Sequence, residues 1–249
     1  MIYYISPSKT MKLDHLEALP QGPFFVAKKP SELLRAQLLK YSVKDLETLY
    51  KVSETVAENA YELLRIDKTG TAMELFEGLV YKNLDYKSLE MSQKVYIDET
   101  LLIGSALYGV VRANQRLRPY RLDLDNPVVL EGQPLTQFWV KKVTNALIKL
   151  DSDTIINLAS EEYSALLDLT RLRKHKKVIR IEFRTINNGK LINGATHAKM
   201  ARGKFVRQAA IEGISTVDAL KDMKVMGYQF DDAYSKEHIF FFTKPTNGA

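Results

Sequence analysis

The sequence predicts an α/β (mixed α+β) fold in a single domain. Short apolar runs typical of buried strands, at 1–5, 101–109 and 154–160, alternate with longer amphipathic stretches typical of helices. An Asn-Gly pair at 188–189 separates two alternating segments, which is the signature of a tight hairpin. The 249 residues contain no repeat, low-complexity tract or long linker, so we expect one domain spanning 1–249.

The first strand, at 1–5, is followed at once by the loop Ser-Pro-Ser-Lys-Thr at 6–10. Lys9 and Thr10 supply a cation and a hydroxyl at the carboxyl end of this strand. Ligands of α/β proteins tend to bind at that edge of the sheet. A solvated turn is the alternative interpretation.

Residues 31–66 predict two helices joined by a short turn. Ser31 is expected to cap the first helix and Ser42 the second. Helix-hairpin-helix elements bind DNA phosphates through the backbone of such a hairpin, but their usual glycine is absent here. The spacing therefore favours a structural helix pair.

Other elements follow from local patterns. A helix within 70–83 is expected to end near 76–81, and 135–150 has the apolar spacing of a helix. Pro119 disfavours a helix at 119–124, so that segment is predicted to be extended. The segments 227–231 and 238–244 predict a two-stranded element at the end of the chain.

The strand at 154–160 ends in small and polar residues. Ser160 is a predicted helix cap, and Glu161 and Glu162 in the first turn suit the positive end of a helix dipole. Asn157, Ser160 and Glu161 thus lie at a strand-to-helix switch equivalent in position to the loop at 6–10.

The helix predicted over 197–213 carries a basic face. Lys199, Arg202 and Arg207 project together, and Gly203 in the same row would let a phosphate or a backbone approach closely. A solvated basic face is the alternative interpretation.

The net charge of +6 is unevenly distributed. Residues 171–207 hold twelve basic side chains and one acid, Glu182, and residues 112–121 hold four arginines and no acid. Concentrated positive charge of this kind indicates a surface that binds a polyanion.

Composition excludes several classes of protein. The chain has no cysteine, which rules out disulfides, thiolate catalysis and cysteine-bound metals. Its four histidines lie far apart, so we expect no metal site. No apolar run is long enough to cross a membrane, and no leader sequence is visible. We therefore expect a cytoplasmic protein with no membrane partner.

Short blocks along nearly the whole chain resemble the YaaA family of peroxide-stress proteins. They are ISPSKT at 5–10, FEGLVY at 76–81, LYGVVR at 107–112, PYRLDL at 119–124, QFW at 137–139, INLASEEY at 156–163, AKMARG at 198–203 and GYQFDD at 227–232. The resemblance implies a single mixed α/β domain with a central mixed sheet, surrounding helices and a positively charged cleft. It also implies a role in surviving hydrogen peroxide by limiting free iron and DNA damage, and DNA binding that involves a helix-hairpin-helix-like element, here at about 31–66.

The resemblance and the positions at strand ends together predict a site. The predicted DNA- or anion-binding residues are Lys9, Arg112, Arg118, Arg121, Lys199, Arg202, Lys204 and Arg207. The predicted polar residues of the pocket wall are Ser6, Thr10, Asn157 and Ser160. We expect Lys9 to bind an anion that Ser6 or Thr10 hydrogen-bonds.

Three functions compete. The leading hypothesis is a stress-response protein that binds duplex or distorted DNA, mainly through phosphates. Tyr108 and Tyr120 could stack on unpaired bases if distorted DNA is preferred, but core packing is the more common fate of such tyrosines. The alternative is an enzyme acting on a nucleotide or nucleobase, with Glu161 as general acid or base; a nucleotide or phosphate would then be its ligand. Direct iron binding has little support. No cofactor is expected.

Overall fold

The computed structural model describes residues 1–245; the last four residues of the predicted domain lie outside this part. The helices are α1 (Lys28–Leu38), α2 (Val43–Tyr50), α3 (Glu54–Arg65), α4 (Ala72–Leu75), α5 (Leu79–Leu84), α6 (Met91–Thr100), α7 (Leu135–Ile148), α8 (Glu161–Ser164), α9 (Leu169–Leu172), α10 (Ala195–Glu212) and α11 (Val217–Asp222), with a 3-10 turn at Tyr86–Ser88. The strands are β1 (Ile2–Ile5), β2 (Gly70–Thr71), β3 (Leu101–Ser105), β4 (Gly109–Arg112), β5 (Arg116–Leu117), β6 (Val129–Leu130), β7 (Gln133–Pro134), β8 (Thr154–Asn157), β9 (Lys177–Asn187), β10 (Lys190–Ile192), β11 (Gln229–Phe230) and β12 (Ile239–Pro245).

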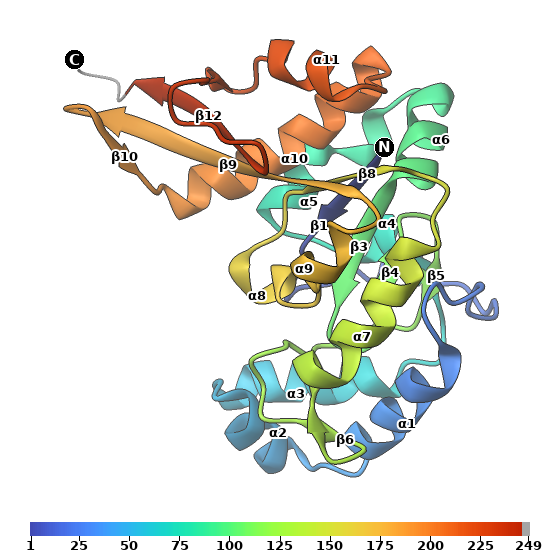
Figure 1. The fold of residues 1–249 in the computed structure, drawn as a ribbon. Helices are drawn as coiled ribbons and strands as arrows, with labels where there is room; N and C mark the ends of the chain where they lie inside the picture. The colour runs from blue at the N-terminus through green and yellow to red at the C-terminus, as the bar shows by residue number, and fades with distance from the viewer. Residues whose placement is uncertain (246–249) are drawn as a thin grey trace.

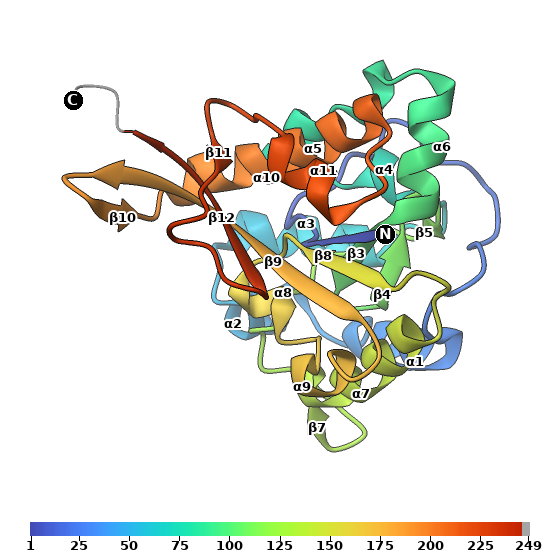
Figure 2. The same ribbon diagram turned by 45° about the horizontal axis from the view of Figure 1, so that its top comes forward.

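A central mixed sheet of eight strands confirms the predicted fold class. Its order is β11-β12-β9-β8-β1-β3-β4, with β10 paired to β9. The strands β12, β9, β8, β1 and β3 run parallel, whereas β4, β10 and β11 are antiparallel to their neighbours. Helices α5, α6, α10 and α11 lie on one side of this sheet and α7 and α9 on the other, with α1 to α3 at the lower end of Figure 1 (Figures 1 and 2).

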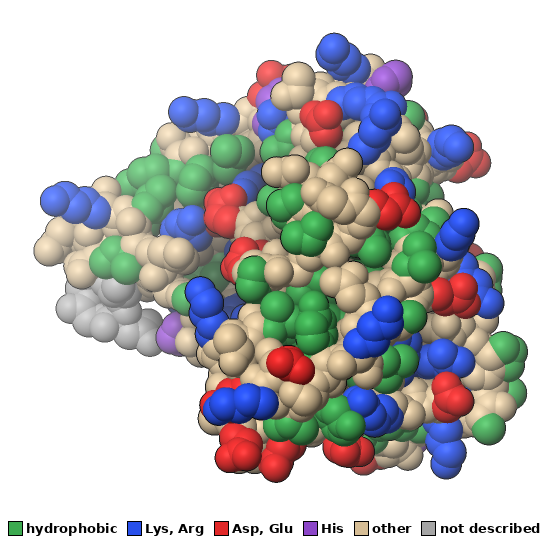
Figure 3. Space-filling model, turned by 90° about the horizontal axis from the view of Figure 1, so that it is seen from below, with side chains coloured by type: hydrophobic (Ala, Val, Ile, Leu, Met, Phe, Trp, Pro, Cys, Tyr) green, Lys and Arg blue, Asp and Glu red, His purple; other side chains and the backbone are tan. Residues whose placement is uncertain are grey.

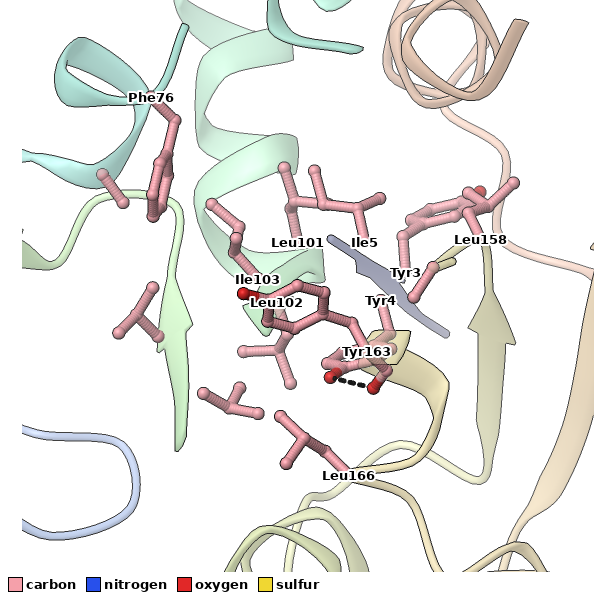
Figure 4. Close-up of a cluster of buried hydrophobic side chains, with 14 of the residues drawn as sticks. Tyr3, Tyr4, Ile5, Phe76, Leu101, Leu102, Ile103, Leu158, Tyr163 and Leu166 are labelled. Atoms are coloured by element: carbon pink, nitrogen blue, oxygen red, sulfur yellow. Dashed lines mark hydrogen bonds between the residues drawn. The ribbon is translucent and has the colours of Figure 1, made fainter. Parts of the chain in front are cut away.

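The centre of the sheet is apolar because it is covered on both faces. All four residues of β1 are buried, and so are all five of β3, as expected for parallel strands under helices. Figure 4 shows Tyr3 and Tyr4 of β1 within this cluster. The Tyr4 hydroxyl satisfies its hydrogen bond inside the core by donating to the Tyr163 carbonyl oxygen at 2.9 Å.

Several local predictions are confirmed. Ser42 caps α2 in a capping box with Asp45, since its Oγ accepts from the Asp45 amide at 3.2 Å and its own amide donates to the Asp45 carboxylate at 2.8 Å. The β9–β10 hairpin turns at Asn188 and Gly189, both with positive φ. At the end of the chain β11 pairs with β12, which also joins β9 in parallel.

The helical region 31–66 differs from its prediction. The first helix begins at Lys28 with Ala27 as N-cap, so Ser31 lies inside the helix and is buried. The predicted second helix is interrupted at Lys51, whose φ of 53° ends α2 before α3 begins at Glu54. The apolar spacing continues across the break because both helices pack on the same core. For that reason the spacing did not predict the turn between α2 and α3.

The predicted helix within 70–83 is also two helices. The segment from Phe76 to Gly78 separates α4 from α5, and Gly78 adopts a φ of 115°, which a residue with a Cβ rarely adopts.

Arg35 connects α1 to the end of α3. Its buried guanidinium donates to the carbonyl oxygens of Leu64 at 2.6 Å, Ile66 at 3.0 Å and Pro119 at 3.0 Å. These carbonyls include ones that a helix C-terminus leaves unpaired. The arginine therefore fixes the three-helix segment to the rest of the domain.

Within residues 1–245, none of the helices is both long enough and apolar enough to cross a membrane.

Gly203 explains how α10 lies against α5. A Cβ at this position would overlap the carbonyl oxygen of Val80 and come within 2.9 Å of the Leu84 amide nitrogen, both backbone atoms of α5. The sequence allowed either a phosphate or a backbone to approach this glycine closely. In the structure, the backbone of α5 does so.

We expect Gly203→Ala to destabilise the protein by about 1–3 kcal/mol, because overpacking against backbone outweighs the gain of about 1 kcal/mol in helix propensity. Urea denaturation measures the change. Lys204→Ala, at the next and exposed position, serves as the control and should change stability by less than about 0.5 kcal/mol. Equal stability of Gly203→Ala and the wild type would contradict the close contact.

Candidate functional site

The candidate site lies where the chain reverses its direction along the sheet. From β1 the chain proceeds towards β3, and from the adjacent strand β8 it proceeds the other way, to β9. In open α/β sheets a crevice forms beyond the carboxyl ends of two such strands. The loop at 6–10 and the turn at 158–160 therefore meet at one edge, as their positions in the sequence predict.

A cavity of about 380 Å³ opens at this edge. It is walled by the loop after β1, the start of α5, the β8–α8 turn and one face of α10. Its polar and charged lining residues are Ser6, Ser8, Lys9, Glu77, Tyr81, Asp123, Ser160, Glu162, Tyr163, Lys199 and Arg202. Three basic and three acidic side chains thus share the wall.

Two hydroxyls join the strand ends. Ser6 Oγ accepts from the Ser160 amide at 2.8 Å and donates to Ser160 Oγ at 3.1 Å. Ser160 also caps α8, because its Oγ accepts from the Tyr163 amide at 3.4 Å. These bonds hold the floor of the cavity in one geometry.

The α10 wall is cationic. Lys199 is exposed at the cavity, and Arg202, one turn further on, is partly buried there. Among residues 1–245 neither side chain makes a hydrogen bond or an ion pair, and Arg202 Nε is buried without a partner. Burial lowers the pKa of Arg202, although the nearby Glu182 acts in the opposite direction. A guanidinium held in this way is open to an anion in the cavity.

Another part of the cavity lining contains carboxylates. Lys9 Nζ lies 3.0 Å from Asp123 Oδ2, and Glu162 Oε1 accepts from the Leu124 amide at 3.1 Å. Burial raises the pKa of Glu162, and the neighbouring Asp125 and Asp123 raise it further. Lys9 is therefore paired with a carboxylate of the wall in this structure.

Two predicted wall residues lie outside the cavity lining. Asn157 is buried beneath the β8–α8 turn, where it donates to Ser164 Oγ at 3.0 Å and accepts from the Ala159 amide at 3.0 Å. Thr10 is exposed and bonds to Ser8 Oγ at 3.2 Å. Both shape the loops that form the wall.

Glu161 is not placed for the acid–base role proposed for it. Its side chain is 85% exposed and pairs with Arg180 Nη2 at 2.7 Å. The hydrogen bond from Arg180 lowers the pKa of Glu161, whereas a general acid at neutral pH needs a raised value. Arg180 in turn bonds to the buried Glu182, which also pairs with Arg184 at 2.8 Å. This network lies beside Arg202 without bonding to it.

The remaining predicted cations do not gather at the cavity. Arg207 donates to the carbonyl oxygens of Leu84 at 3.0 Å and Asp85 at 2.8 Å, so it caps the end of α5. The other four are dispersed: Arg112 lies over the Phe25 ring, Arg118 pairs with Asp67, Arg121 donates to the Lys9 carbonyl oxygen, and Lys204 is exposed outside the lining.

The carboxylates of the cavity lining were not predicted from the sequence, whereas core packing was the favoured interpretation for Tyr108 and Tyr120 and is confirmed. Asp123 and Glu162 both lie in blocks noted above, at 119–124 and 156–163, and that placement was the available signal. Tyr108 and Tyr120 are buried and pack edge to face with ring centroids 5.5 Å apart, so stacking on bases is excluded in this conformation. Across residues 1–245 no three histidines or carboxylates are arranged to hold a metal ion.

Adjacent glutamates should respond to pH in opposite ways. Because the pKa of Glu162 is raised on folding, its ionisation destabilises the native state as pH rises through the interval above its ordinary value. Glu162→Gln should therefore stabilise the protein at neutral pH, and the gain should vanish on acidification.

Glu161→Gln is the matched comparison. The pKa of Glu161 is lowered on folding, so its ionised form stabilises the fold of the wild type, and this contribution is lost as pH falls. The variant should lose up to about 1 kcal/mol at neutral pH, as is usual for exposed pairs, and nothing in acid. Urea denaturation of both variants and the wild type, from acid to neutral pH, measures the two changes in stability. Parallel pH profiles for the two variants would refute the opposite pKa shifts of Glu161 and Glu162.

Comparisons with known proteins place the chain in a family. The family profile described as peroxide stress protein YaaA matches residues 1–234. A UPF0246 protein of Lactobacillus johnsonii is 35% identical over 250 residues, covering 96% of both chains. UPF0246 proteins of Crocosphaera subtropica and Francisella tularensis are each 31% identical, over 252 and 256 residues, covering 98% of this chain and 100% of theirs. The chain therefore belongs to the YaaA (UPF0246) family of peroxide stress proteins.

Proposed function

We propose that this peroxide stress protein binds DNA, including distorted duplexes, in the cytoplasm and protects it from damage linked to free iron. The observation that carries the proposal is a pair of cations at an open cavity, Lys199 and Arg202, that have no partner within residues 1–245. Phosphate oxygens are natural partners for such groups, and Arg binds them through several donors at once.

The position of these two cations matters more than the overall charge. On the face seen in Figure 3, Lys and Arg side chains are interspersed with Asp and Glu, so no uniform positive field covers it. Binding would then depend on particular cations that lack a protein partner. The α10 wall provides two of them within one helical turn.

The basic stretch 171–207 divides between two edges of the sheet. Residues 171–177 precede or begin β9 and so lie at its amino end, whereas Lys199 and Arg202 lie at the cavity beyond the carboxyl ends of β1 and β8. The two groups can therefore be tested separately.

The test is fluorescence anisotropy of a labelled duplex and of the same duplex with an unpaired bubble, across a range of salt concentrations. Each neutralised phosphate contributes about 0.9 to the slope of log affinity against log salt. Lys199→Glu/Arg202→Glu should weaken binding to both DNAs and lower that slope by about 2.

Arg173→Glu/Lys174→Glu is the matched control, because it reverses the same charges at exposed positions on the other edge of the sheet. It should leave the slope nearly unchanged. Equal weakening by both variants would show that net charge alone attracts DNA, and absence of binding by the wild type would end the proposal.

A further inference from the structure

The cavity lining contains carboxylates and apolar groups that phosphate binding does not need. Lys199 and Arg202 of α10 line the cavity together with Asp123, which pairs with Lys9, and Glu162. Carboxylates repel phosphates, so their presence would weaken a site for phosphate alone. Together with the cations, they suit a ligand that is anionic at one end and donates hydrogen bonds at the other.

One residue of the cavity lining, Tyr163, carries a buried hydroxyl without a partner in the described part of the chain. Tyr163, which lines the cavity, is only 3% exposed, and its Oη makes no hydrogen bond within residues 1–245. Leaving a buried hydroxyl unpaired costs free energy that a partner would recover. Two residues of the lining, Arg202 and Tyr163, thus each carry a buried polar atom that has no partner within residues 1–245.

The size and the apolar lining indicate the class of ligand. A volume of about 380 Å³ falls within the range of small-molecule sites. Pro7, Leu79 and the ring of Tyr81 add apolar surface to the lining. A flat heterocycle fits such surface, and aromatic contact with a nucleobase is tolerant of sequence.

We propose that the cavity receives one unpaired nucleotide. Its phosphate binds Lys199 and Arg202, and its base lies against the apolar surface with its N–H groups towards Asp123 and Glu162, since carboxylates accept hydrogen bonds from base edges. The inference rests on the proposed DNA binding for the source of the nucleotide, which is a base displaced from a distorted duplex. A free mononucleotide carries the same chemistry and is the other source.

Blocking the cavity without changing charge tests this directly. Leu79 is 38% exposed at the cavity, so Leu79→Trp should fill the entrance while the protein folds normally. The wild type should prefer the bubble over the duplex by about fivefold or more, as stacking of one base predicts. The variant should lose that preference and keep its duplex affinity. Leu33→Trp, 44% exposed on α1, is the control and should retain the preference.

A second pair of variants removes single hydroxyls. Tyr163→Phe deletes a group with no protein partner, so stability should not fall, but competition by guanosine monophosphate for labelled bubble DNA should weaken by up to about tenfold. Tyr50→Phe is the control: its hydroxyl is also buried without a partner, but Tyr50 does not line the cavity. Ribose 5-phosphate and inorganic phosphate should compete less well than the mononucleotide.

The outcomes separate this inference from DNA binding itself. Loss of the bubble preference in Leu79→Trp with duplex affinity intact supports a nucleotide displaced from DNA. Loss of mononucleotide competition alone supports a free nucleotide as the source. Unchanged behaviour of Leu79→Trp and Tyr163→Phe, or inorganic phosphate competing as well as the mononucleotide, would overturn the inference while leaving duplex binding standing.

Discussion

The parallel pairing of β1 with β8 is the interaction on which the rest of the site depends. Their ladder aligns Ile2 with Ile155 and Tyr4 with Asn157, and the Leu158 amide extends it by donating to the Tyr4 carbonyl oxygen at 2.8 Å. Because both strands are buried on both faces, their register cannot shift without exposing apolar side chains. The ladder therefore brings Ser6 and Ser160, 154 residues apart, within hydrogen-bonding distance and creates the edge at which the cavity opens.

The close approach of α10 to α5 is the second constraint. Gly203 lets the two backbones touch, and Arg207 secures the contact by binding the carbonyl oxygens at the end of α5. Arg202 lies between Lys199 and Gly203 along the helix, so this contact holds it at the cavity, where it forms no ion pair within residues 1–245. A partly buried cation without a partner costs free energy, and such costs cluster at sites that bind ligands. The packing of α10 and the proposed chemistry of its cationic face are thus consequences of one contact.

Charge at the cavity is organised by pairing. Lys9 and Asp123 neutralise each other, and Arg180, Glu182, Arg184 and Glu161 form a network beside the cavity. Among the lining residues within 1–245, Lys199 and Arg202 are the cations that make no ion pair, and Glu162 of the same lining is hydrogen-bonded to backbone. This arrangement is the basis for proposing a nucleotide, a ligand with two different ends, rather than an isolated phosphate as the occupant of the cavity.

Local chemistry in the sequence determined the fold class, the strand ends that form the site, the Ser42 and Ser160 caps and the Asn188-Gly189 hairpin, because each depends on residues within a few positions of one another. Helical spacing likewise predicted that Lys199 and Arg202 share a face. What meets that face was decided by tertiary structure alone: α5 against Gly203 and carbonyl oxygens for Arg207. The same holds for the partners of two residues outside α10, Asp123 for Lys9 and Arg180 for Glu161. Periodicity shows which side chains project together, but the partner of each one depends on segments tens of residues away, and their approach is set by packing of the whole core.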